Sequence, residues 1–300
     1  MTSVRAGNRL RAKVWRRTRL REARWPGVPV TSSGDTGYHI DMRLPTARER
    51  EYLKDLVVVL TQKEIQLRYK NSWLGYVWSV ANPLMFAILY FVAFKTFMRI
   101  DIPRYSLFLI AGLFPWQWFA NSISAAPNIF LGNATLLKKV RFPRNALVTP
   151  TVLNDGIHFL CSIPVLVLFL FVYGSRPAWS WLIGIPLLAV GQFLLLYGFA
   201  LTIASLNLFF RDLERLTTLV VTFLFFLTPV VYSESMVPAQ YRAIVYLNPA
   251  APIILSWRNL FLVGDLNWPL IAAGFAHAGV ILAVGAAVYR KLCWKFAEVV

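Results

Sequence analysis

Residues 68–145 decide the fold: they begin RYKNSWLGYVWSVANPLM, continue through AGLFPWQWF and end in NATLLKKVRFPRN. Two runs without Asp, Glu, Lys or Arg lie here, at residues 71–94 and 105–137, and a basic segment follows the second. Each run exceeds the roughly 20 apolar residues that span about 30 Å of hydrocarbon. The order of apolar run, short exit, apolar run and basic return predicts a membrane hairpin that begins and ends in the cytoplasm.

The rest of the chain repeats this pattern. Residues 177–210 and 266–289 are also uncharged, residues 146–173 are interrupted only by Asp155, and residues 216–232 form a shorter apolar run. The chain is 57% hydrophobic and only 15% charged, which is outside the range of ordinary soluble domains. The sequence therefore predicts an all-α integral membrane protein with six transmembrane helices.

The positive charge of the chain sets the expected orientation. A net charge of +17 would suggest a nucleic-acid partner in a soluble protein. Here about 25 of the 31 Lys and Arg residues fall in the segments 1–72, 124–145, 207–216 and 290–300, which the six spans place on one side. By the positive-inside rule both termini are cytoplasmic, and nucleic acid is not an expected partner.

The sequence carries few signs of catalysis. Its two cysteines, Cys161 and Cys293, fit neither a disulfide framework nor a metal site, and its three histidines have no ligand spacing. There is no G-x-x-x-x-G-K-[ST] phosphate-binding loop, no G-x-S-x-G nucleophile motif and no D-x-D pair. We expect a chain that is not an enzyme and that binds no cofactor or metal itself.

Two segments precede the first span. Residues 1–45 are Arg-rich, with eight Arg and Lys13 in the first 24 positions and no apolar signal-peptide core. They predict a disordered cytoplasmic arm that lies on anionic lipid, or an arm without a specific role. Residues 46–71 combine helically spaced leucines with charges, which predicts an amphipathic interfacial helix or a cytosolic helix that packs on a partner.

Between the second and third spans the sequence predicts a cytoplasmic helix at residues 128–141. It is amphipathic, and Pro143 stops it. Such a helix suits docking into the groove of a cytosolic partner, whereas a simple positive-inside anchor would explain its charges but not its apolar face. Its apolar members are Ile129, Phe130, Leu136, Leu137 and Val140, and its basic members are Lys138, Lys139 and Arg141.

Three further features carry functional hypotheses. The aromatic residues in and around the first two spans are either lipid-facing and core residues or platforms for sugar rings. Asp155 is the charged residue inside a predicted span, so it is a functional candidate with a structural alternative. Residues 234–264 contain the apolar run 243–257, which is too short to cross and is broken by Pro249 and Pro252, so this segment is predicted to form external re-entrant helices.

The ordered blocks RYKNSWLGYVWSVANPLM, AGLFPWQWF, LLKKVRFPRNALVTP, LNLFFRDLERL and PVVYSESMVPAQYRAIVYLNPAAPIILSWRNLF resemble the permease subunit of type-2 ATP-binding-cassette (ABC) exporters. They resemble most the branch that carries lipid-linked polysaccharide, such as O-antigen, teichoic acid, capsule or galactan. The resemblance covers about residues 48 to 290 and leaves out the Arg-rich arm.

This resemblance implies a homodimer in the bacterial cytoplasmic (inner) membrane, paired with two separate ATPase subunits that bind ATP and Mg. Residues 72–290 would be the six-span domain, 128–141 the coupling helix, 234–264 the external gate helices and 291–300 a cytoplasmic tail. A channel between the two permeases would be lined by aromatic residues, and the carrier's diphosphate would meet paired cations. The candidates are Tyr76, Trp116, Trp118 and Tyr232 for the channel, and Arg68, Lys70 and Arg144 for the diphosphate.

Two other functions remain open. An ion-coupled secondary transporter would use Asp155 as its proton or cation site. A polyprenyl-phosphate glycosyltransferase or flippase would act alone, although the chain lacks the acidic cluster that would hold a metal against a sugar diphosphate.

Overall fold

The computed structural model describes residues 47–69, 78–99, 101–139 and 142–299, and every regular element in these ranges is helical. The first half contains α2 (Ala47–Tyr69), α3 (Trp78–Tyr90), the π-helix η2 (Phe91–Phe97), α4 (Tyr105–Ala125), α5 (Asn128–Leu131), α6 (Ala134–Lys139), the 3₁₀ turn η3 (Arg144–Leu147) and α7 (Val148–Val172). The second half contains α8 (Trp181–Asn207), α9 (Leu213–Leu227), η4 (Glu234–Met236), η5 (Ala239–Tyr241), α10 (Arg242–Leu247), α11 (Ala251–Leu262), α12 (Trp268–Leu292), η6 (Cys293–Lys295) and α13 (Phe296–Val299).

Three helical segments are long and apolar enough to cross a membrane, judged by length and composition over the described residues. They cover Arg144–Val172, Trp181–Asn207 and Trp268–Lys295. The prediction of an all-α integral membrane protein is confirmed at this level. The other predicted spans correspond to α3 with η2, to α4 and to α9, which ends at Leu227 rather than Tyr232 because Thr228 and Pro229 leave the helix.

Helix α4 is the centre of the bundle. It packs against α7, α11, α3, α8 and α9, and buried residues occur on all of its faces from Tyr105 to Ile123. A helix that is apolar all round is either buried among other elements or surrounded by lipid, and the burial of α4 shows the first arrangement. Pro115 lies inside α4, and the side-chain amide of Gln192 on α8 donates to its carbonyl at 2.8 Å.

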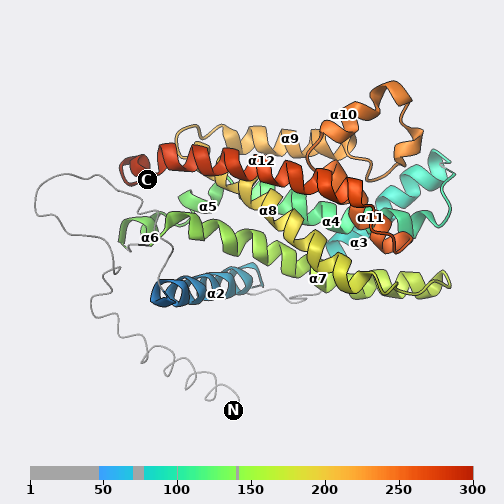
Figure 1. Cartoon of the computed structure of the whole chain (residues 1–300), viewed down its shortest axis with the longest axis horizontal. Helices are drawn as coiled ribbons and strands as arrows, with labels where there is room; N and C mark the ends of the chain where they lie inside the picture. Colours follow the sequence, from blue (N-terminus) through green and yellow to red (C-terminus); the bar gives the residue numbers. More distant parts are fainter. Residues whose placement is uncertain (1–46, 70–77, 100, 140–141, 300) are drawn as a thin grey trace, which may run out of the picture.

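The bundle has two distinct ends (Figure 1). The first, which we call the α5–α6 end, carries α5, α6 and the C-terminal helix α13, and α2 lies near it beside α7. The opposite end, which we call the α10 end, carries α10, the start of α12 and the turn between α7 and α8. Elements far apart in sequence therefore meet at each end.

Helix α12 packs along α8 at very short range (Figure 1). A Cβ atom on Gly198 of α8 would lie 2.7 Å from the backbone nitrogen of Leu282. A Cβ atom on Gly285 of α12 would lie 2.5 Å from the carbonyl oxygen of Gly198. The two glycines allow the backbones to touch, as small residues do between helices in membranes.

We expect Gly285→Ala to lower the melting temperature of the purified protein by roughly 3–10 °C, because overpacking costs about 1–3 kcal/mol and exceeds the gain in helix propensity. Gly279→Ala on the same helix is the matched control, since no atom of the described residues, apart from the neighbouring backbone of α12 itself, lies within 4 Å of its new methyl group. Thermal unfolding in the same detergent measures both. Equal melting temperatures for the two variants would contradict the close α8–α12 contact.

Candidate functional site

The predicted coupling helix is two short helices, α5 and α6, rather than one helix over residues 128–141. The chain turns at Gly132 and Asn133, where the Asn133 side chain donates to the carbonyl of Ile129 at 2.9 Å and closes α5. A glycine followed by an asparagine favours the end of a helix. The described residues leave out Val140, Arg141 and the side chain of Lys139.

The apolar side chains of this segment point into the chain itself. Ile129, Phe130 and Leu137 are buried, and Leu136 packs against the same core. The apolar face that was expected to dock on a partner is therefore covered by the chain's own residues, because these side chains close the α5–α6 end of the bundle. The exposed side of the segment carries Gly132, Thr135 and Lys138.

Polar contacts tie the segment to three neighbouring helices. The side-chain amide of Asn128 donates to the Glu214 carboxylate of α9 at 3.1 Å, and the Lys63 ammonium of α2 donates to the side-chain amide oxygen of Asn133 at 3.1 Å. The buried Asn207 amide at the end of α8 donates to the Pro127 carbonyl at 2.9 Å. A displacement of α5 or α6 would therefore pull on α2, α8 and α9 together.

The C-terminal tail holds the same end of the bundle. Phe296 is fully buried, and its ring centroid lies 5.0 Å from that of Phe130 and 5.9 Å from that of Tyr289. Arg144 donates to the carbonyl of Cys293 at 2.6 Å and lies over the Phe296 ring. Sequence reasoning missed Phe296, because a lone phenylalanine in a basic tail carries no local signal of burial.

Of the three cations proposed to meet the diphosphate, the structure describes the side chain of Arg144 alone. Arg144 is half-buried against the C-terminal tail. The side chain of Arg68 and all of Lys70 lie outside the described residues, as does Tyr76 of the channel candidates.

Each of the other three channel candidates is in contact with other residues of the same chain. Trp116 is buried against Phe225 of α9, and Trp118 is buried with its indole N–H donating to the Val152 carbonyl at 3.0 Å. The Tyr232 hydroxyl donates to the Phe226 carbonyl at 2.9 Å. Trp116 and Trp118 are thus core residues in this conformation, because α4 is surrounded rather than facing a channel.

Asp155 is buried in α7 and accepts a hydrogen bond from the Ser122 hydroxyl of α4 at 3.0 Å. Its neighbour Asn154 is also buried, and its carbonyl oxygen has no hydrogen-bond partner among the described residues. The hydrogen bond from Ser122 to the buried Asp155 carboxylate joins α4 to α7. This contact supports a structural role for Asp155, the alternative to a functional one.

At the α10 end, one buried arginine organises the chain. Arg258 of α11 is only 4% exposed, and its guanidinium donates to the carbonyls of Pro229 and Val230, the latter at 2.8 Å. The central carbon of the guanidinium, Cζ, lies 3.9 Å from the centroid of the Phe108 ring. Burial lowers the pKa of Arg258 to about 9, and the Glu234 carboxylate acts in the opposite direction.

The expected external segment is largely folded into the bundle. Helix α11 is buried and packs against α4, α8 and α12, whereas α10 is mostly exposed. The signal for Arg258 was present in the sequence, since it is a single charge at the end of the apolar run 243–257. Its partners are carbonyls, which no side-chain pattern identifies.

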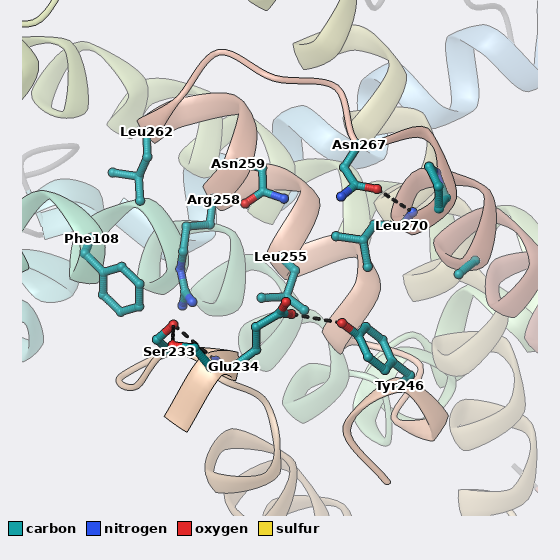
Figure 2. Close-up of a pocket in the computed structure, with 13 residues that line it drawn as sticks. Phe108, Ser233, Glu234, Tyr246, Leu255, Arg258, Asn259, Leu262, Asn267 and Leu270 are labelled. Carbon is teal, nitrogen blue, oxygen red and sulfur yellow. Dashed lines mark hydrogen bonds between the residues drawn. The ribbon is translucent and has the colours of Figure 1, made fainter. Parts of the chain in front are cut away.

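A cavity of about 720 Å³ opens beside this arginine (Figure 2). Its walls come from η4, α10, α11 and the start of α12, together with Phe108 of α4. Polar side chains from separate elements converge there, among them Glu234, Tyr246, Asn259 and Asn267.

A bundle of apolar, membrane-length helices with charged and polar elements at its ends is a multi-pass membrane protein. A family model described as ABC-2 type transporter matches residues 55–262. The chain belongs to this family, and it is a membrane permease of the type-2 ABC class.

Several relatives align over nearly their whole length. The chain is 48% identical to the O-antigen export system permease protein RfbA of Klebsiella pneumoniae, over 83% of this chain and 96% of the relative. It is 30% identical to the RfbA protein of Myxococcus xanthus, over 84% and 97%. It is 22% identical to the polysialic acid transport protein KpsM of Escherichia coli, over 80% and 94%.

Replacing Arg258 by Lys should destabilise the protein although the charge is kept. An ammonium group cannot reach several carbonyls in one plane while lying flat on Phe108, and each unpaired buried carbonyl costs about 1–3 kcal/mol. We expect a lower melting temperature and a smaller folded fraction on size-exclusion chromatography. Arg242→Lys is the control, because Arg242 is exposed; a similar effect in both would contradict the assigned role of Arg258.

Proposed function

We propose that this chain is the permease subunit of an ABC exporter that moves a polysaccharide across the bacterial cytoplasmic membrane. The supporting observation is the alignment with O-antigen export permeases at up to 48% identity over most of both chains. The polysialic acid transport proteins among the relatives also act on a polymer of sugars. The polymer would be attached to a polyprenyl diphosphate, as in O-antigen, galactan or teichoic-acid export.

The energy would come from two ATPase subunits bound in the cytoplasm. The sequence lacks a phosphate-binding loop, so ATP hydrolysis is assigned to a partner, and this chain would hold no ATP or Mg. The α5–α6 segment is the candidate contact, with the exposed Thr135 and Lys138 facing the partner and Ile129, Phe130, Leu136 and Leu137 transmitting its movement to the bundle. Lys139, Val140 and Arg141, whose side chains lie outside the described residues, are further candidates for contact with the ATPase.

The subunit would work as a homodimer with six spans and both termini in the cytoplasm. Helix α9 exposes large apolar side chains, among them Leu219 and Phe223, and α3 exposes Met85 and Ile88. Such surfaces need lipid or a second subunit to cover them. Tyr76 and Tyr232 remain channel candidates in the dimer, and Arg68 and Lys70 the cations for the diphosphate.

Association with an ATPase tests this proposal most simply. A C-terminally tagged chain, extracted in mild detergent, should carry a stoichiometric cytosolic P-loop ATPase that is identified by mass spectrometry and hydrolyses ATP. We expect the double variant Thr135→Asp with Lys138→Asp to reduce the recovered ATPase at least tenfold, because charge reversal at a docking surface repels a complementary partner.

The control for this experiment is Lys291→Asp, an exposed site of the same charge on α12. It should retain the ATPase. A clean oligomer of wild-type chain without any ATPase would contradict the proposed function.

Substitution of Asp155 distinguishes an ATP-driven permease from an ion-coupled secondary transporter. The amide oxygen of Asp155→Asn can still accept from Ser122, so we expect surface polysaccharide, quantified on cells with a specific antibody or lectin, to stay within about twofold of wild type. Asp212→Asn, at an exposed carboxylate, is the control. Loss of export in folded Asp155→Asn protein would instead favour a proton-coupled mechanism.

A further inference from the structure

The cavity at the α10 end has no role in the proposed coupling to an ATPase, since it lies at the opposite end of the bundle from α5 and α6 (Figure 1). Its volume of about 720 Å³ lies in the range of small-molecule sites, which run to roughly 300–1,000 Å³. Such sites combine apolar walls with a few convergent polar groups. Here the apolar walls include Leu255, Leu262 and Leu270.

One wall of the cavity is held rigid. Arg258 fixes the backbone at Pro229 and Val230, and the Tyr105 hydroxyl donates to the Val231 carbonyl at 2.8 Å. The backbone that leads into η4 is therefore fixed from two sides. A preformed wall lowers the ordering cost of binding a ligand.

Several polar groups on the cavity remain available to a ligand. The side-chain oxygen of Asn267 caps α12 by accepting from the backbone N–H of Leu270 at 3.2 Å. The side-chain N–H groups of Asn267 therefore remain available to a ligand. No hydrogen bond to the Asn259 side chain occurs among the residues that the structure describes. Glu234 accepts from the Tyr246 hydroxyl through one carboxylate oxygen at 3.1 Å, which leaves the other (Figure 2).

An aromatic face accompanies these groups. Tyr246 is 38% exposed, and Glu234 fixes its hydroxyl, so its ring is positioned at the rim of the cavity. Aromatic faces carry partial negative charge and attract the weakly positive C–H groups of a sugar ring. The Phe108 ring cannot serve in this way, because Arg258 covers it.

The charges oppose an anionic ligand. The guanidinium of Arg258 is occupied by backbone carbonyls and the Phe108 ring, and the carboxylate of Glu234 faces the cavity. A metal is also disfavoured, because no cluster of three or more His, Cys, Asp or Glu residues forms among the described residues. What remains is an uncharged, hydroxyl-rich molecule that both donates to a carboxylate and accepts from amides.

We infer that this cavity is a binding site for uncharged sugar units of the exported glycan. The carboxylate of Glu234 accepts from sugar hydroxyls, the amides of Asn259 and Asn267 donate to them, and the Tyr246 ring stacks on one sugar face. The identity of the sugar as a piece of the exported polymer rests on the proposed function. The cavity would hold the polymer at the end of the bundle opposite the ATPase contact.

Binding is tested with the wild-type chain in lipid nanodiscs, where both faces are accessible and no sugar-based detergent competes. The probe is an oligosaccharide of one to three repeats, released by mild acid from the host's own surface polysaccharide and free of lipid. Isothermal titration calorimetry and saturation-transfer NMR measure its affinity. We expect Asn259→Leu and Glu234→Gln each to weaken binding at least tenfold, and Tyr246→Ala to remove the NMR contact to the sugar C–H protons.

Asp265→Asn is the matched control, because Asp265 is an exposed carboxylate near α12 that does not line the cavity. It should bind like wild type, and all variants should keep the wild-type melting temperature within a few degrees. Unchanged affinity in Asn259→Leu and Glu234→Gln would overturn the inference, as would competition by inorganic phosphate or occupation of the cavity by lipid. If the wild-type chain exports polymer with its ATPase but does not bind the probe, this inference is wrong and the proposed function still holds. Failure of export would instead contradict the proposed function.

Discussion

The burial of one guanidinium is the constraint on which the α10 end of this protein depends. Arg258 is a charge in an apolar helix, and burying a charge is costly unless hydrogen bonds compensate for the lost water. Its terminal N–H groups find carbonyl acceptors, whereas its Nε–H has no hydrogen-bond partner among the described residues. The carbonyls after α9 and the ring of Phe108 supply that environment. In return, the arginine fixes where the chain leaves α9 and turns into η4. The cavity wall and the positions of Glu234 and Tyr246 follow from this arrangement.

Hydrogen bonds from side chains to backbone carbonyls also hold the opposite end, with different residues. There the carbonyls of Cys293 and Pro127 accept from Arg144 and Asn207, and aromatic contacts around Phe296 fill the space between helices. The central helix α4 joins the two ends, since Phe108 contacts Arg258 near its start and α5 follows its last turn. A movement of α5 therefore has a continuous packed route to the cavity.

Sequence could predict the helices and the membrane class, because apolar runs and their length are local properties. It placed a candidate coupling segment near residues 128–141, but it could not show that Phe130 and Leu137 are buried. Burial depends on distant elements, such as Phe296 of α13, which packs on Phe130, and α8, which packs on α5. It also offered Trp116 and Trp118 as channel residues, whereas their burial follows from the central position of α4. The partners of Arg258 are backbone carbonyls, which leave no pattern in a sequence. Packing between elements far apart in the sequence decides whether an aromatic or amphipathic segment faces outward or into the bundle.

We propose that ATP hydrolysis by a bound partner drives polymer movement through this chain. The direct measurement is transport in proteoliposomes that contain the purified permease with its ATPase and a fluorescently labelled lipid-linked glycan. Accessibility of the label to an added quencher reports the membrane face that it occupies. We expect movement that requires both subunits and ATP and is absent when ATP is not hydrolysed. Movement by the permease alone under an ion gradient, unaffected by ATP, would contradict it.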